Sequence, residues 1–208
     1  MQFCNLGLVV NSRLLRENDR IVTVFTRDWG KFEVNFKSVS LAKGKLKALS
    51  VPVSWGDYRF YLKKGSNFPV CTGGSTLSVF SGIRSDYDKL CMGFHYCELI
   101  NRLTPAQQPA PRKYDLLLEA LKDLDLNGFG PWSRFAFTLR VLELAGFGFR
   151  ETATGVDSEL WEKLHDADWE TVRALPPHRE YLAYTDALIR RFFADALNCE
   201  LNTSAFVN

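Results

Sequence analysis

The first 80 residues alternate between apolar and polar positions with a period of two, which is typical of β-strands. The clearest segment runs from Lys31 to Lys37, where phenylalanine or valine alternates with charged and amide side chains. Four further segments have strand character: 4–10, 21–26, 51–62 and 68–79. Five short strands predict a small closed barrel, because closure leaves no exposed strand edge.

After Gly82 the apolar positions recur at three- and four-residue spacing, which predicts helices. The first helix begins near Ser85, which together with Asp88 resembles a capping arrangement, and it stops before Pro105. Further helices are expected over 114–127, 132–145, 158–164, 169–175 and 179–197. The 132–145 helix is apolar nearly all round and therefore belongs at the centre of a bundle. The predicted fold is α+β, with a five-stranded barrel over residues 1–80 and an all-helical domain over residues 81–208.

The two halves of the chain differ in charge. The whole chain has a formal net charge of +2, from 26 basic and 24 acidic residues. Residues 1–80 hold 12 of the basic and 5 of the acidic residues, a balance of +7, and the remaining residues have a balance of −5. This asymmetry favours a basic module for an anionic partner, attached to an ordinary scaffold.

Many of the barrel cations fall on strands, on turns or in one lysine-rich loop. Several cations along one groove neutralise phosphates and give affinity without reading sequence. The residues predicted to bind DNA in this way are Arg13, Arg20, Lys31, Lys37, Lys43, Lys45 and Lys47. Five aromatic residues are candidate stacking platforms for unpaired bases, with packing in the core or at an edge as the alternative for each: Trp29, Trp55, Tyr58, Phe60 and Tyr61.

The sequence favours binding over catalysis. It carries no nucleotide-binding glycine loop, metalloprotease motif or hydrolase elbow, and its three histidines are isolated. Its five cysteines include no C-x-x-C pair, so we expect reduced, mostly buried thiols in a cytoplasmic protein. No apolar run approaches the roughly 18 residues of a membrane span. We therefore expect no catalytic residue, no cofactor, no metal site and no membrane association.

The order of several motifs gives a family resemblance. In the barrel half these are residues 7–13 (GLVVNSR), 17–26 (ENDRIVTVFT), 29–31 (WGK) and the basic loop 37–47 ahead of Leu49 and Pro52. In the helical half they are 96–99 (YCEL), 103–105 (LTP), 134–147 (RFAFTLRVLELAGF) and 201–206 (LNTSAF). With these motifs in this order the chain resembles the RecO family of recombination mediators nearly from end to end.

The resemblance implies a fold, a function and partners. It implies an amino-terminal OB barrel that binds single- and double-stranded DNA, and a helical carboxy-terminal domain. It also implies annealing of complementary strands in the RecF pathway of recombination. With RecR as partner, such a protein loads recombinase onto DNA coated with the single-stranded-DNA-binding protein SSB, so that it acts on the recombinase filament indirectly. The expected location is the cytoplasm, in association with the nucleoid.

The resemblance also implies a docking site for the acidic SSB tail on the helical domain. Arg134 and the adjacent Phe135 match that site, whereas Ser133 stands where some relatives have a cation, so Arg112 and Lys113 are the expected substitutes. Many relatives carry a four-cysteine zinc ribbon after the central helix, but residues 148–158 contain no cysteine, so we expect a variant without the ribbon. The alternative to a mediator is a non-catalytic adaptor whose OB barrel binds protein or RNA.

Overall fold

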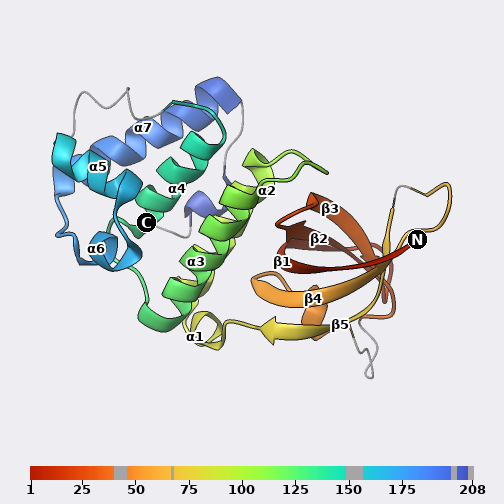
Figure 1. Cartoon of the computed structure of the whole chain (residues 1–208). Helices are drawn as coiled ribbons and strands as arrows, with labels where there is room; N and C mark the ends of the chain where they lie inside the picture. Colours follow the sequence, from red (N-terminus) through yellow and green to blue (C-terminus); the bar gives the residue numbers. More distant parts are fainter. Residues whose placement is uncertain (40–45, 67, 149–156, 198–200, 206–208) are drawn as a thin grey trace.

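A β-barrel and a group of helices lie side by side in the chain (Figure 1). The computed structural model describes residues 1–39, 46–66, 68–148, 157–197 and 201–205. Its strands lie within residues 2–78 and its α-helices within residues 81–197, so the predicted α+β fold is confirmed. Among the helices in these ranges, none is both long and apolar enough to cross a membrane.

Five strands form the barrel, which closes in the order β1, β2, β3, β5, β4. Their bounds are β1 Gln2–Leu14, β2 Arg20–Thr26, β3 Gly30–Phe36, β4 Ser54–Tyr61 and β5 Val70–Ser78. β1 pairs with β4 through its first half and with β2 through its second half, and a bulge at Val10 bends it between them. β3 and β5 form a short parallel pairing, in which Asn35 lies opposite Val70. A closed barrel of five strands is the architecture of the OB-fold.

The alternation along the strands determines which side chains fill the barrel. In β3, Phe32, Val34 and Phe36 are buried, whereas Glu33 is exposed, as the period of two predicted. β2 is different, because six of its seven residues are buried. Val22 and Val24 on its inner face pack in the barrel, and Phe25 on its outer face packs against the helical domain.

The helices follow the predicted order. Their bounds are α1 Ser81–Arg84, α2 Tyr87–Leu103, α3 Pro111–Asn127, α4 Ser133–Leu144, α5 Ser158–Asp166, α6 Trp169–Ala174 and α7 Arg179–Leu197. Among the described residues, α1 and two 3-10 turns, η1 Ala48–Ser50 and η3 Asn202–Ala205, were not predicted, because segments of three or four residues carry no periodic signal. The expected cap at Ser85 is wrong: Asp86 caps α2, and its carboxylate accepts hydrogen bonds from the backbone N–H groups of Asp88 (2.9 Å) and Lys89 (3.0 Å).

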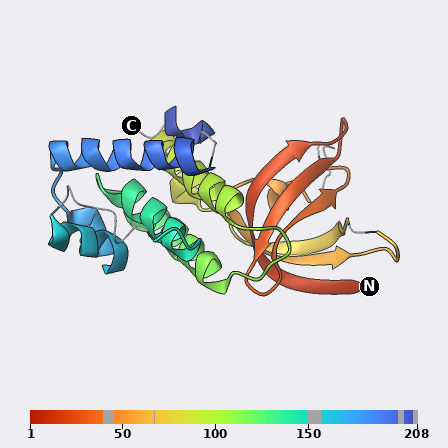
Figure 2. The ribbon, with the colours of Figure 1, turned by 90° about the horizontal axis from the view of Figure 1, so that it is seen from above.

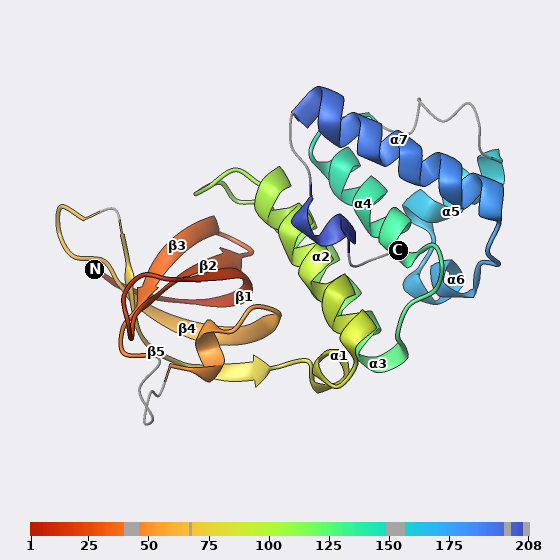
Figure 3. The same ribbon diagram turned by 180° about the vertical axis from the view of Figure 1, so that it is seen from behind.

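α4 occupies the centre of the helical domain, as its apolar sequence predicted. Eight of its twelve residues are buried, and it contacts α2, α3, α5 and α6. α7 lies along its outer side (Figure 3). α2 and α3 separate this group from the barrel, so they form the wall on which the barrel rests (Figures 1 and 2).

The barrel and the helices share one hydrophobic core. Leu8, Phe25 and Val53 lie on the outside of the barrel, yet they belong to the same buried cluster as the helical side chains. Polar contacts reinforce this junction: the Trp55 indole N–H donates to the Tyr114 hydroxyl at 3.1 Å. The two halves are therefore packed against each other rather than tethered.

Candidate nucleic-acid interface

The strongest candidate phosphate site lies at the end of the β2–β3 hairpin that is remote from the helices. Arg20 begins β2 and is paired with Phe36, which precedes Lys37. The backbone N–H of Ser38 donates to the Asp19 carboxylate at 2.9 Å, so the turn before β2 and the segment after β3 are tied together. Within the described part of the chain neither Arg20 nor Lys37 forms an ion pair, and both remain available to an anionic ligand.

Arg13 belongs to the same face but has an acidic neighbour. Its guanidinium contacts the Glu33 carboxylate at 3.2 Å, and both side chains are about half exposed. Such exposed pairs contribute little energy, so a phosphate can compete with Glu33 for Arg13. Arg13 therefore remains a candidate with a partly neutralised charge.

Lys31 has a structural role instead. Its ammonium group donates to the backbone carbonyl of Asn101 in α2, and burial lowers its pKa. Arg27 is used in a similar way, since it pairs with Asp115 of α3 at 3.0 Å. Both cations hold the barrel against the helices. Because its ammonium group is used in this way, Lys31 is not among the proposed DNA contacts.

The loop between β3 and β4 is described only in part. Lys47 is exposed at the start of η1 and forms no ion pair with another described residue. Lys43 and Lys45 lie outside the described residues, so their role stays a prediction.

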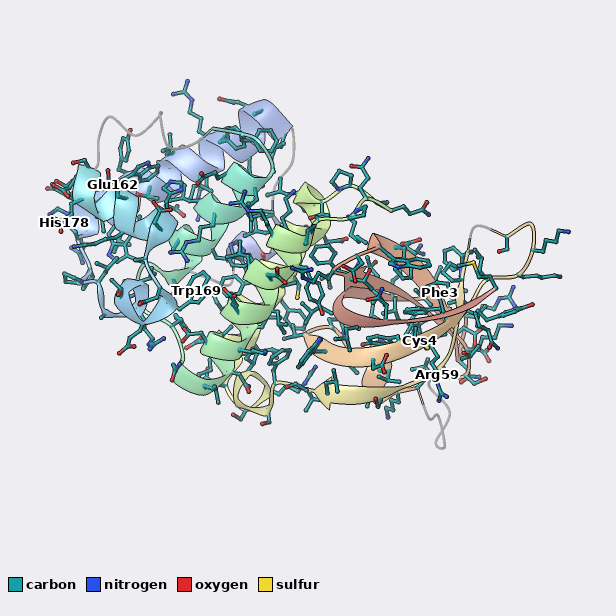
Figure 4. All side chains as sticks on the ribbon, in the orientation of Figure 1. Phe3, Cys4, Arg59, Glu162, Trp169 and His178 are labelled. Atoms are coloured by element: carbon teal, nitrogen blue, oxygen red, sulfur yellow. The ribbon has the colours of Figure 1, made fainter. Side chains whose placement is uncertain are left out.

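Three further barrel cations were missed as candidates: Arg59, Lys63 and Lys64. All three are exposed, and in the described ranges none forms an ion pair. Arg59 faces outward on β4 opposite Cys4 of β1 (Figure 4). Lys63 and Lys64 follow β4 after one residue, Leu62, and two adjacent lysines in a turn between strands are a signal that can be read from the sequence.

The five candidate stacking residues separate into three groups. Tyr58 and Phe60 are fully buried in the barrel, where burial raises the pKa of the Tyr58 hydroxyl, so the packing alternative holds for both. Trp55 is part of the junction with α3. Trp29 and Tyr61 are each 41% exposed and remain available to a ligand.

The expected partner site on the helical domain is occupied by intramolecular contacts. The Arg134 guanidinium pairs with Asp186 of α7 at 3.0 Å and lies over the Phe135 ring, 4.4 Å from its centroid. Phe135 itself is buried. An acidic peptide would therefore have to displace Asp186 to reach Arg134.

The two substitute residues differ in their surroundings. Arg112 is exposed at the start of α3. Lys113 is buried, and its ammonium group donates to the Leu103 carbonyl at 2.5 Å. Burial lowers the pKa of Lys113, and its position argues against a role in peptide binding.

Cysteines and possible metal-ligating side chains are the remaining candidates for chemistry among the described residues. Among these residues no group of three or more His, Cys, Asp or Glu side chains is placed to hold a metal ion. Cys71 and Cys97 are buried, Cys91 is half-buried and Cys4 is exposed, while Cys199 lies outside the described residues. Burial raises the pKa of Cys71 to about 11, so this thiol is not activated as a nucleophile.

Family models match both halves of the chain. The model described as "Recombination protein O N terminal" matches residues 1–80, which is the barrel. The model described as "Recombination protein O C terminal" matches residues 84–202, which is more than half of the chain. The chain belongs to the RecO family. The resemblance inferred from the sequence is thereby confirmed.

Curated relatives agree with this membership. Proteins named "DNA repair protein RecO" from Listeria monocytogenes and Listeria innocua are 30% identical over 131 residues, which cover 63% of this chain and 50% of each relative. The RecO protein of Streptomyces coelicolor is 32% identical over 148 residues, which cover 68% of this chain and 60% of the relative. The chain thus matches about half the length of these RecO proteins.

Proposed function

We propose that this RecO-family chain acts in DNA repair and recombination by binding DNA, without catalysing a reaction. The observation that carries the proposal is the set of barrel cations that form no ion pair with other described residues, Arg20 and Lys37 foremost. Membership of a family whose curated relatives are named DNA repair proteins supports the same role. Phosphate contacts of this kind give affinity for single and double strands alike.

The proposal extends to the mediator activity of the family. Cations on the barrel reduce the repulsion between two phosphate backbones, so one protein surface brings complementary strands together for annealing. The acidic tail of SSB is proposed to dock beside Arg134, in exchange for Asp186. Arg112 is a separate candidate, because it lines a pocket with Glu143 and Leu144 at the other end of α4. RecR is the proposed partner in loading recombinase.

The test is the salt dependence of DNA binding by the double variant Arg20→Ala/Lys37→Ala. Fluorescence anisotropy with a labelled single-stranded oligonucleotide measures the observed binding constant between about 50 and 200 mM salt. Each phosphate contact to a single strand contributes about 0.7 to the slope of log K against log salt, so the variant lowers the slope by about 1.4. Affinity at the lowest salt also falls.

The matched control is Arg179→Ala/Arg191→Ala, which removes two exposed cations from the helical domain and changes the net charge equally. We expect it to leave the slope unchanged. If the two double variants have the same slope, the phosphates lie elsewhere. Binding that hardly changes with salt would favour the adaptor function instead, because docking of apolar protein surfaces releases few counterions.

A further inference from the structure

A pocket lies where the start of the barrel meets the linker between α2 and α3. It has a volume of about 410 Å³. Its barrel wall is largely aromatic and includes Phe3, Trp29 and Phe32, while Gln107 and Pro109 of the linker form the opposite wall. The volume fits a single nucleobase or a comparable flat group.

The aromatic wall is built as a stack. The rings of Phe3 and Trp29 lie 4.4 Å apart with an interplanar angle of 11°, and Phe3 packs in turn against Phe60 inside the barrel at 5.1 Å. Figure 4 labels Phe3 on the barrel, near the start of β1. Trp29 is thus fixed from beneath by core residues, yet it remains 41% exposed. A rigid, exposed indole at the edge of a pocket is a platform to which another flat ring can be added at little entropic cost.

A loop with two exposed lysines borders the pocket on the barrel side. Leu62 and Pro69 line it, and they are the two ends of the loop that carries Lys63 and Lys64. Asp28 also lines the pocket, but its carboxylate lies 3.9 Å from the Arg27 guanidinium. The balance favours an anionic strand over an acidic peptide.

The linker wall supplies polar groups. Gln107 has a left-handed backbone conformation (φ 58°), and its N–H donates to the Lys31 carbonyl at 2.7 Å. Ala106 forms a bridge with Lys31 as well, so the linker is attached to the edge of β3. This attachment holds the exposed amide side chain of Gln107 at the pocket, where an amide both donates to and accepts from base edges.

We propose that this pocket binds one unpaired base of a single-stranded nucleic acid, stacked on Trp29 and facing Gln107. The inference rests on the proposed DNA-binding function and deepens it, because it adds a site for the base to the sites for phosphate. A paired base cannot reach the pocket without leaving its duplex. The pocket therefore gives the protein a preference for single strands that barrel cations alone do not provide.

The test compares oligo(dT) with an abasic strand of the same length, in which every base is replaced by hydrogen. Anisotropy measures binding of both strands to wild type, Trp29→Leu and Trp29→Phe. Leucine keeps an apolar side chain but removes the flat ring, whereas phenylalanine keeps a ring. We expect wild type to prefer oligo(dT), Trp29→Leu to lower that preference by roughly fivefold or more, and Trp29→Phe to retain most of it. Binding of the abasic strand should stay within about twofold, which also shows that the variants are folded.

Phe129→Leu is the matched control, because Phe129 is 40% exposed but lies between α3 and α4, away from the pocket lining. If Trp29→Leu keeps the wild-type preference, or if wild type binds both strands equally, the base site is refuted while phosphate binding stands. If wild type binds neither strand at low salt, the proposed function itself fails. If Trp29→Leu lost affinity for oligo(dT) and for the abasic strand equally, a base-specific site would likewise be refuted.

Discussion

At the scale of single residues, the neighbours of a cation decide what it does. Lys31 and Arg20 both lie on strands of the barrel, but the Lys31 ammonium donates to the Asn101 carbonyl. Among the described residues, the Arg20 guanidinium contacts only the Ser12 hydroxyl, at 3.4 Å. The period of two assigns each side chain to a face of its strand and does not say what packs on that face. The charge excess of the barrel is therefore predictable from the sequence, but the predicted DNA contacts include one cation, Lys31, that the helical domain uses.

His95 shows how a titratable residue can be purely structural. The Thr203 hydroxyl donates its one proton to the Glu98 carboxylate at 2.7 Å, so it accepts a hydrogen bond from Nδ1 of His95 at 2.8 Å. Burial lowers the pKa of His95 to about 3, and the nearby Arg134 charge acts in the same direction. The imidazole is thus neutral and holds the carboxy-terminal turn against α2.

This geometry predicts a pH dependence of stability. An unfolded histidine takes up a proton below pH 6.5 or so, whereas folded His95 does so only near pH 3, so stability is full above the unfolded pKa and falls as pH decreases. The loss is at most about 1.4 kcal/mol per pH unit. In His95→Asn the amide N–H replaces the Nδ1–H donor and does not titrate. We expect urea unfolding to show a smaller loss of stability from pH 7 to pH 5 in this variant than in wild type.

Between pH 7 and pH 5, the change in stability reports on His95 and not on Glu98. Burial raises the pKa of Glu98, but hydrogen bonds from Asn202, Thr203 and Arg102 outweigh burial and lower it below 4.5. Its contribution is therefore lost only at more acidic pH. Equal pH dependence of wild type and His95→Asn between pH 7 and 5 would contradict the assignment.

At the scale of elements, the sequence identified each long helix and all five strands, because their periodic patterns extend over enough residues to be read. The errors lie at the ends. Ser85 was expected to cap α2, but Asp86 does so. Serine and aspartate are both good N-cap residues. Which of them caps α2 depends on where the backbone leaves the one-turn helix α1, which ends just before Ser85. A helix of four residues leaves no pattern from which this turn could be foreseen.

The corrected cap gives a prediction with a matched control. Asp86→Ala removes the acceptor for two backbone N–H groups at the start of α2 and should lower the free energy of unfolding by about 1 kcal/mol. Ser85→Ala removes only the contact of its hydroxyl with the Gly82 carbonyl and should cost under about 0.5 kcal/mol. Urea denaturation of the two variants shows which residue caps α2. A larger loss of unfolding free energy in Ser85→Ala than in Asp86→Ala would mean that Ser85 is the cap.

At the scale of the whole molecule, the continuous apolar run of β2 already contained information about the junction. A strand with one solvent face alternates, but Ile21–Phe25 is almost uniformly apolar or β-branched, which is typical of a strand covered on both faces. What covers the second face could not be read, because contacts between residues far apart in sequence leave no local pattern. The structure places α3 there, with the Tyr114 and Phe25 rings 5.7 Å apart.

This shared core predicts that the chain unfolds as one unit. Phe25 is fully buried on the outer face of β2 and packs in the helical cluster, so Phe25→Ala should cost about 3–5 kcal/mol. Circular dichroism at 222 nm follows the unfolding of the helices. Tryptophan fluorescence gives a second unfolding curve, to which the buried Trp132 and Trp161 of the helical domain contribute. We expect Phe25→Ala to lower the midpoints of both curves together. Phe129→Ala, at an exposed position, should move neither curve by much. If the barrel and the helices were independent, Phe25→Ala would leave the helical transition at its wild-type midpoint and a second transition would appear. A strand bound to the pocket between Trp29 and Gln107 contacts both halves, so the same coupling would let it stabilise the molecule as a whole.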